Sequence, residues 1–150
     1  MIGIKDQCFG VEVELTGITR QQAAQTLANY FGTRARHIRG GYDTWTVSDT
    51  EGKEWKLMSD SSIKAERKEN GRYVRTSDTE YRVEMVSPKL TYDELPKFQE
   101  CVRQVRHAGG KVFDRLTAPV PIGGTGAAFQ THSDSSVCSH LFLTYACQGI

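Results

Sequence analysis

Residues 8–16, CFGVEVELT, constrain the fold most, because apolar and polar side chains alternate along them. This period of two predicts a β-strand with one buried face. Glu12 and Glu14 fall together on the other face, about 7 Å apart. Two carboxylates so close repel each other unless a cation or an arginine lies between them. The pair therefore indicates either an ordinary exposed face or a platform for Mg²⁺, which prefers carboxylate oxygens.

Two later segments carry the signals of a helix start and a helix end. Thr19 and Gln22 have capping-box spacing, and Gly32 is a natural C-terminal stop. Thr91 and Glu94 repeat the spacing, and Gly109 ends that segment. Apolar residues at helical spacing lie between these signals: Ala23, Leu27, Tyr30 and Phe31 in the first segment, and Leu95, Phe98, Val102 and Val105 in the second.

The remaining pattern predicts strands joined by turns. Residues 43–48 and 54–58 form a β-hairpin around the turn 49–53, and further strands are expected at 81–87 and from 111 onward. The charged segment 64–80 contains Asn70-Gly71, which fits a mobile loop or an exposed hairpin. Hairpins placed between helices favour an α+β fold, an antiparallel sheet with two flanking helices.

Two further acids stand out. Glu84 interrupts an apolar strand, where Arg82 on the same face could pair with it, and Asp60 follows a strand in an ordinary turn position. In an antiparallel sheet these acids could converge with the two of the first strand. The shared face would hold metal-bound phosphates, with Lys56 or Arg82 near the transferred group. The glycines at 123, 124 and 126 are not followed by Lys-Ser or Lys-Thr, so the sequence has no Walker A motif.

Composition excludes some other functions. The formal net charge of +1 argues against a general binder of nucleic acids or anionic membranes. Arg34, Arg36 and Arg39 are read as a solvated strand face or loop. No apolar run reaches the roughly 18 residues of a membrane span. Four cysteines without a CxxC pattern indicate reduced thiols in a cytoplasmic protein, and Cys8 and Cys101 fit core positions. His132, Cys138, His140 and Cys147 match no common zinc spacing.

Charge falls abruptly near residue 115. All 19 Lys and Arg residues and 17 of the 18 acids precede residue 116, and Asp134 is the one charge after it. This predicts a division into residues 1–113 and a low-charge tail, residues 114–150. The tail is a linker, a buried apolar element of a larger assembly, or the product of a shifted reading frame.

The order of the motifs resembles the amidoligase family, relatives of the glutamate–cysteine ligase and glutamine synthetase group. The resemblance covers about residues 7–113. It rests on FGVEVE at 9–14, Trp55, DSSI at 60–63, VEMVSP at 83–88 and AGGKV at 108–112.

The resemblance implies a curved antiparallel sheet with ATP and Mg²⁺ on its inner face. It implies that ATP phosphorylates a carboxylate and that an amine then displaces the phosphate to form an amide. The partners would be small-molecule or peptide carboxylates and amines, without nucleic acid or membrane. By position, Glu12, Glu14 and Glu84 resemble the metal ligands, Glu12, Glu84 and Asp60 the catalytic residues, and Lys56, Ser62 and Arg82 the ATP-binding residues.

The tail departs from this family. Members continue after the second helix into a G-x-H-x-H-V type strand, and this sequence has no such motif at that position. The departure predicts an incomplete glutamine-synthetase-like domain, from a truncated or frameshifted gene product that is inactive by itself. The alternative is a non-catalytic binding or structural module that retains the ligase-like fold.

Overall fold

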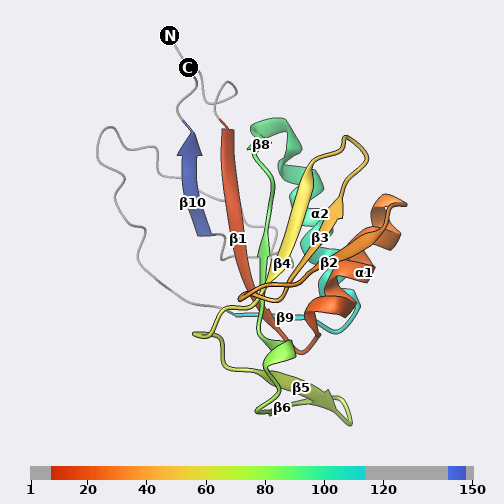
Figure 1. The fold of residues 1–150 in the computed structure, drawn as a ribbon, viewed down its shortest axis with the longest axis vertical. Coiled ribbons are helices and arrows are strands. Elements are labelled where there is room, and N and C mark those ends of the chain that lie inside the picture. Colours follow the sequence, from red (N-terminus) through yellow and green to blue (C-terminus); the bar gives the residue numbers. More distant parts are fainter. Residues whose placement is uncertain (1–7, 114–141, 148–150) are drawn as a thin grey trace.

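The structure is a computed structural model that describes residues 8–113 and 142–147. Its elements form one main sheet, a separate hairpin and two α-helices (Figure 1). The main sheet contains β1 (Cys8–Thr16), β2 (Ala35–Ile38), β3 (Thr44–Ser48), β4 (Glu54–Met58), β7 (Val83–Val86), β8 (Leu90–Thr91), β9 (Lys111–Val112) and β10 (Phe142–Cys147). The hairpin is β5 (Glu66–Glu69) and β6 (Arg72–Arg75); the helices are α1 (Arg20–Phe31) and α2 (Leu95–His107), with 3₁₀ turns η2 (Thr79–Tyr81) and η3 (Tyr92–Glu94).

The main sheet is antiparallel throughout its described pairs. Its order is β10-β1-β7-β4-β3-β2, and the short strands β8 and β9 also pair with β1. The observed architecture confirms the expected α+β fold with an antiparallel sheet and two helices. The predicted boundary at residue 113 is not tested, because only the backbone of β10 is described within the tail.

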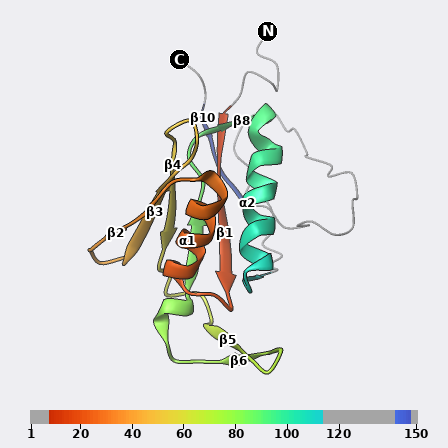
Figure 2. The ribbon, with the colours of Figure 1, turned by 90° about the vertical axis from the view of Figure 1, so that its right-hand side faces the viewer.

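Both helices cover the same face of the sheet (Figure 2). Thr19 and Gln22 form the expected capping box, and Gly32 ends α1 in a left-handed conformation with φ of 69°. Tyr30 was expected in the buried stripe but is 42% exposed, and Ala24 and Ala28 are buried there instead. Small side chains allow α1 to approach the sheet closely. The second capping box forms at Thr91 and Glu94, one 3₁₀ turn before α2.

The alternation of β1 separates the two faces of the sheet as predicted. The face toward the helices carries the core, which includes Val11, Val13, Leu15, Trp55, Leu57, Val83 and Met85. The other face, which we call the open face, carries Glu12 and Glu14 of β1, Lys56 of β4 and Glu84 of β7. The same strands therefore build the core and display the charged residues.

Two elements differ from or refine the sequence prediction. Two of the four residues of β2 are charged or titratable, and the strand is exposed along most of its length. Hydrophobic patterning therefore does not identify β2 as a strand. The segment 64–80 adopts the hairpin rather than the loop. Its turn places Asn70 and Gly71 at φ values of 47° and 78°, which is the backbone conformation that an Asn-Gly hairpin turn requires.

No helix in the described ranges is long and apolar enough to cross a membrane.

Candidate active site

Three glutamates lie on neighbouring central strands of the open face. Glu14 of β1 is directly opposite Glu84 of β7, and Glu12 is opposite Val86. Residues opposite each other in an antiparallel pair have Cβ atoms about 5 Å apart. Alternation places Glu12 and Glu14 on the same side of β1. The structure therefore brings together the three glutamates that the sequence assigned to a metal platform.

Asp60 reaches the same region from the end of β4. Met58, the last residue of β4, is opposite Glu84, and Asp60 follows two residues later. The Asp60 carboxylate accepts a hydrogen bond from the backbone N–H of Ser62 (2.8 Å), and its carbonyl accepts one from Ile63 (3.2 Å). Ile63 is buried and anchors this turn. Local turn structure therefore fixes Asp60 just after β4, the strand that pairs with β7 and thus lies next to Glu84.

The four acids act on one another electrostatically. Burial raises the pKa of Glu84 to about 7, with further increases from the charges of Glu12, Asp60 and Glu14 and from a hydrogen bond with Glu12. A carboxyl group with this pKa is partly protonated at neutral pH. The neighbouring carboxylates therefore disfavour a negative charge on Glu84, and a bound cation would relieve this repulsion.

Lys56 occupies the same open face, two strands away from Glu12. Lys56 is opposite Val86, which is itself opposite Glu12, so these three residues form one row across β4, β7 and β1. The Lys56 side chain is exposed. Lys56 therefore places a positive charge in the same row of the open face as Glu12.

Arg82 and Ser62 have more limited placements. Arg82 lies just before β7, and its carbonyl accepts a hydrogen bond from Arg20 Nη1 (3.0 Å). Its buried Nε atom has no hydrogen-bond partner, and the ion pairs of the described residues include none between Arg82 and Glu84. The possible Arg82–Glu84 pair is therefore not formed. Ser62 is exposed, and its backbone N–H closes the Asp60 turn.

The donor set fits a hard divalent cation in its chemistry. Carboxylate oxygens are the protein ligands that Mg²⁺ selects, and the cluster supplies four carboxylates. Among residues 8–113 and 142–147, however, no three His, Cys, Asp or Glu side chains are already arranged as the ligands of one ion. Ion binding would therefore need small side-chain rearrangements of these glutamates.

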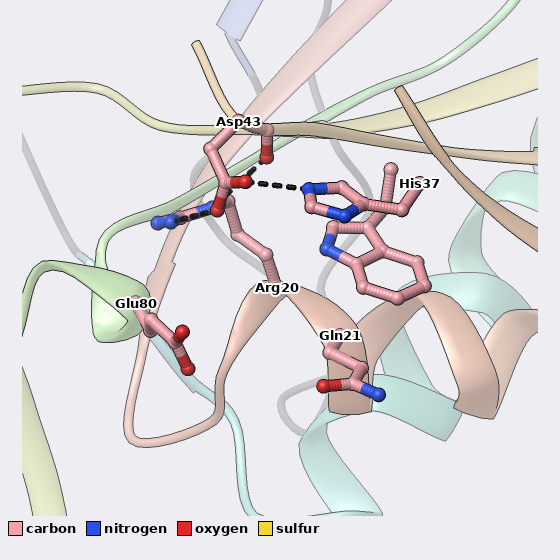
Figure 3. A pocket seen from close by; sticks show the side chains of 6 residues that line it. Arg20, Gln21, His37, Asp43 and Glu80 are labelled. Carbon is pink, nitrogen blue, oxygen red and sulfur yellow. Dashed lines mark hydrogen bonds and ion pairs between the residues drawn. The ribbon is translucent and has the colours of Figure 1, made fainter. Parts of the chain in front are cut away.

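A second cluster, at the start of α1, was missed by sequence reasoning. Arg20 is only 4% exposed, and its guanidinium bonds the Asp43 carboxylate (2.5 Å) and the carbonyls of Thr79 (2.6 Å) and Arg82 (3.0 Å). His37 Nε2 lies 2.5 Å from the other Asp43 oxygen, and its ring stacks on Trp45 at 4.6 Å. Figure 3 shows the pocket that Arg20, His37, Asp43 and Trp45 line with Gln21 and Glu80. Hydrogen bonds from Arg20 and His37 hold the pKa of Asp43 below its usual value.

One sequence signal could have indicated this cluster. Arg20 is the first residue of α1, where the positive end of the helix dipole disfavours a cation. A cation in that position suggests a specific acidic partner, which here is Asp43. The exposed His37 is held by the same carboxylate.

Several other sequence candidates are structural or lie outside the described residues. Cys101 is a buried free thiol in α2, and burial raises its pKa to about 12, which agrees with a core role. Cys8 is also free and half-buried. His132, Cys138, His140 and the glycines at 123, 124 and 126 lie outside the described residues, and only the backbone of Cys147 is described.

Comparison with known proteins gives one match. A family described as "putative amidoligase enzyme" matches residues 5–136, which extends beyond the segment whose motifs carried the resemblance. No curated protein and no solved structure gives a significant match. The match spans most of the sequence, including every acid of the open-face cluster. The chain therefore belongs to the amidoligase family.

Proposed function

We propose that this chain forms amide bonds from a carboxylate and an amine at the expense of ATP, with Mg²⁺ bound by the acids of the open face. Family membership supports ligase chemistry. The observation that carries the proposal is the convergence of Glu12, Glu14 and Glu84 on adjacent strands, with Lys56 in the same row.

The proposed reaction has two steps, as in the glutamate–cysteine ligase and glutamine synthetase group. A carboxylate oxygen of the acceptor attacks the γ-phosphorus of ATP, and the bond from that phosphorus to the bridging oxygen breaks. An acyl phosphate and ADP result. The amine nitrogen then attacks the acyl carbon, the carbon–oxygen bond to phosphate breaks, and phosphate leaves while the nitrogen loses a proton to water.

Each site residue has a part in this proposal. Glu12, Glu14 and Glu84 would hold Mg²⁺, which when bound neutralises charge on the phosphates during transfer. Asp60 orients this end of the site from its fixed turn. Lys56 contacts the transferred phosphoryl group, and Arg82 and Ser62 contact ATP. Positioning of the reactants supplies much of the acceleration in such transfers.

The direct test is calorimetric titration of the full chain with MgATP. We expect Glu84→Gln to weaken binding by about tenfold or more, because one carboxylate ligand is lost. Glu54→Gln is the matched control, since Glu54 is an exposed glutamate of β4 with its side chain on the same face. Equal binding of MgATP by the wild type and Glu84→Gln would contradict the metal assignment.

A non-catalytic module with the ligase-like fold is the second candidate. It is favoured by the lack of three preset metal ligands among the described side chains. Release of ADP in the presence of a panel of carboxylates and amines separates the two. Turnover that Glu84→Gln abolishes supports the ligase, whereas cooperative unfolding with no turnover supports the module.

The free thiols of Cys8 and Cys101 and the need for ATP fit a cytoplasmic location, which we include in the proposal.

A further inference from the structure

Two cysteines stand at opposite positions in the pairing of β1 with β10. Cys8 is the first residue of β1 and Cys147 is the last residue of β10, and the antiparallel register makes them direct Cα partners. Figure 1 shows that the start of β1 and the end of β10 lie at the same end of the sheet. Nearly the whole sequence separates the two residues, so no spacing in the sequence indicates that they form a pair.

This register brings the two backbones to the distance that a disulfide bond requires. Directly opposite residues of an antiparallel pair have Cα atoms about 4.5–5.5 Å apart. Disulfide bonds join residues whose Cα atoms are about 4.4–6.8 Å apart. The pairing is regular from Cys8 to Gly10, and its one irregularity falls after Gly10. A bond between Cys8 and Cys147 is therefore compatible with the strand pairing as it stands.

Cys8 is suited to an exchange reaction, whereas Cys101 is not. Cys8 is a free, half-buried thiol at the end of a strand, so a small reagent can reach it from solvent. Cys101 lies fully buried in α2, and burial raises the pKa of its thiol to about 12. Because the thiolate is the reactive form, Cys101 is protected from oxidation and serves as an internal reference.

We propose that Cys8 and Cys147 are a reversible disulfide site that fastens β10 to β1. The reaction is thiol–disulfide exchange with a small disulfide such as glutathione disulfide. One protein thiolate attacks a sulfur of the reagent, whose S–S bond breaks and releases one thiol. The second protein thiolate then attacks the protein sulfur of the mixed disulfide and releases the second thiol. The two protein thiols lose their protons and two electrons, and the reagent is reduced to two thiols.

The bond would make the attachment of β10 dependent on redox state. When both cysteines are reduced, the pairing of residues 8–12 with residues 142–147 holds β10 against β1. The disulfide would add a covalent link that closes a loop of almost the whole chain, which restricts the unfolded state. Glu12 lies in the same pairing, opposite Phe142, so oxidation would also fasten the strand that borders one acid of the open face. A reducing medium keeps the two thiols free.

The test is peptide mapping of the full chain by mass spectrometry after incubation with oxidised glutathione and alkylation of the remaining thiols. We expect a linked pair of peptides that contain Cys8 and Cys147, lighter by two hydrogen atoms than the separate peptides, which dithiothreitol separates again. Cys8→Ser and Cys147→Ser should each abolish this link. Cys101→Ala is the matched control and should leave the link unchanged, since Cys101 is buried in α2.

Thermal unfolding gives a second measurement. Oxidation should raise the unfolding temperature of the wild type by about 5–15 °C, and dithiothreitol should reverse the increase. The same treatment should leave the unfolding temperature of Cys8→Ser unchanged. An increase that persists in Cys8→Ser would contradict the assignment of the bond to this pair.

Other results of the mapping would also overturn the proposal. These are a link from Cys8 to Cys138, links between two chains whose yield rises with protein concentration, or complete alkylation of Cys8 and Cys147 after oxidation. None of these measurements requires ATP, so the outcome is independent of the proposed ligase function.

Discussion

Glu14 and Glu84 lie directly opposite each other on β1 and β7, where burial, together with the charges of Glu12, Asp60 and Glu14, raises the pKa of Glu84 to about 7. In the unfolded chain this carboxyl group has a pKa near 4.5. The folded protein therefore binds more protons than the unfolded chain between these two values. The contribution of Glu84 to the free energy of unfolding therefore falls as the pH rises through this window and is lowest above it.

The direction of this pH dependence can be tested with Glu84→Gln in the presence of a chelator. At pH 8 the variant should be more stable than the wild type by about 1–3 kcal/mol, because a repelled charge is removed. At pH 4 the two should be nearly equal, since Glu84 is then protonated. Urea unfolding at both pH values measures this, and Glu54→Gln should show no such pH-dependent difference.

Arg20 provides a second prediction, which concerns the start of β7. Its guanidinium bonds Asp43 and the carbonyls of Thr79 and Arg82, and it is nearly buried. Arg20→Met should cost about 2–4 kcal/mol, because these acceptors lose their donor. The exposed Arg39→Met should change the free energy of unfolding by less than about 0.5 kcal/mol. Similar stabilities of the two variants would show that the cluster is not structural.

Asp49 holds the turn between β3 and β4 and is 3% exposed. Burial alone would raise its pKa, but hydrogen bonds from Lys97 (2.7 Å), Trp55 (3.1 Å) and two backbone N–H groups lower the pKa overall. Its charge therefore stabilises the fold at neutral pH, and this contribution is lost as the pH falls below about 4.

Asp49→Asn should thus cost about 2–3 kcal/mol at pH 7 and much less at pH 3. Tryptophan fluorescence during urea unfolding follows the change, because Trp55 is fully buried next to this carboxylate. Asp93→Asn, at an exposed position, is the control. A cost that stays constant between the two pH values would mean that the Asp49 charge makes no contribution.

Gly17 and Gly52 form a natural pair for comparison. Their φ values are 78° and 79°, but a Cβ on Gly17 would lie 2.5 Å from Tyr73 Cε1 and 2.8 Å from the Gly109 carbonyl oxygen, whereas one on Gly52 meets nothing within 4 Å. Gly52→Ala should cost about 1 kcal/mol from backbone strain alone. Gly17→Ala should cost at least about twice as much, as measured by thermal unfolding. Equal costs would mean that the β5–β6 hairpin, which contributes Tyr73, moves away freely.

The sequence predicted the elements whose signals are local. Alternation in β1 and the capping boxes at Thr19 and Thr91 act within a few residues, so each can be recognised without knowledge of the fold. β2 could not be recognised, because its pairing with β3 is a tertiary contact and its residues show no hydrophobic period.

The same distinction applies to the site. Alternation predicted that Glu12 and Glu14 share a face, but the proximity of Glu84 and Asp60 depends on the strand order β1-β7-β4, which no local pattern specifies. Arg20 was missed for a related reason. Its partners are residues 43, 79 and 82, and only the folded backbone brings their oxygen atoms together.

The pairing of β1 also bears on how the protein folds. This strand contacts β7 and β8 along one edge and β9 and β10 along the other, and Glu12 is paired with both Val86 and Phe142. During synthesis β1 is therefore made well before the strands with which it pairs. Pairings of such long sequence separation are slow to form. The hairpin β3–β4 and both helices can form earlier from local contacts. The acids of β1 would join the rest of the open face only in the last stage of folding, so a chain stalled before that stage would have a folded framework without the assembled cluster of acids.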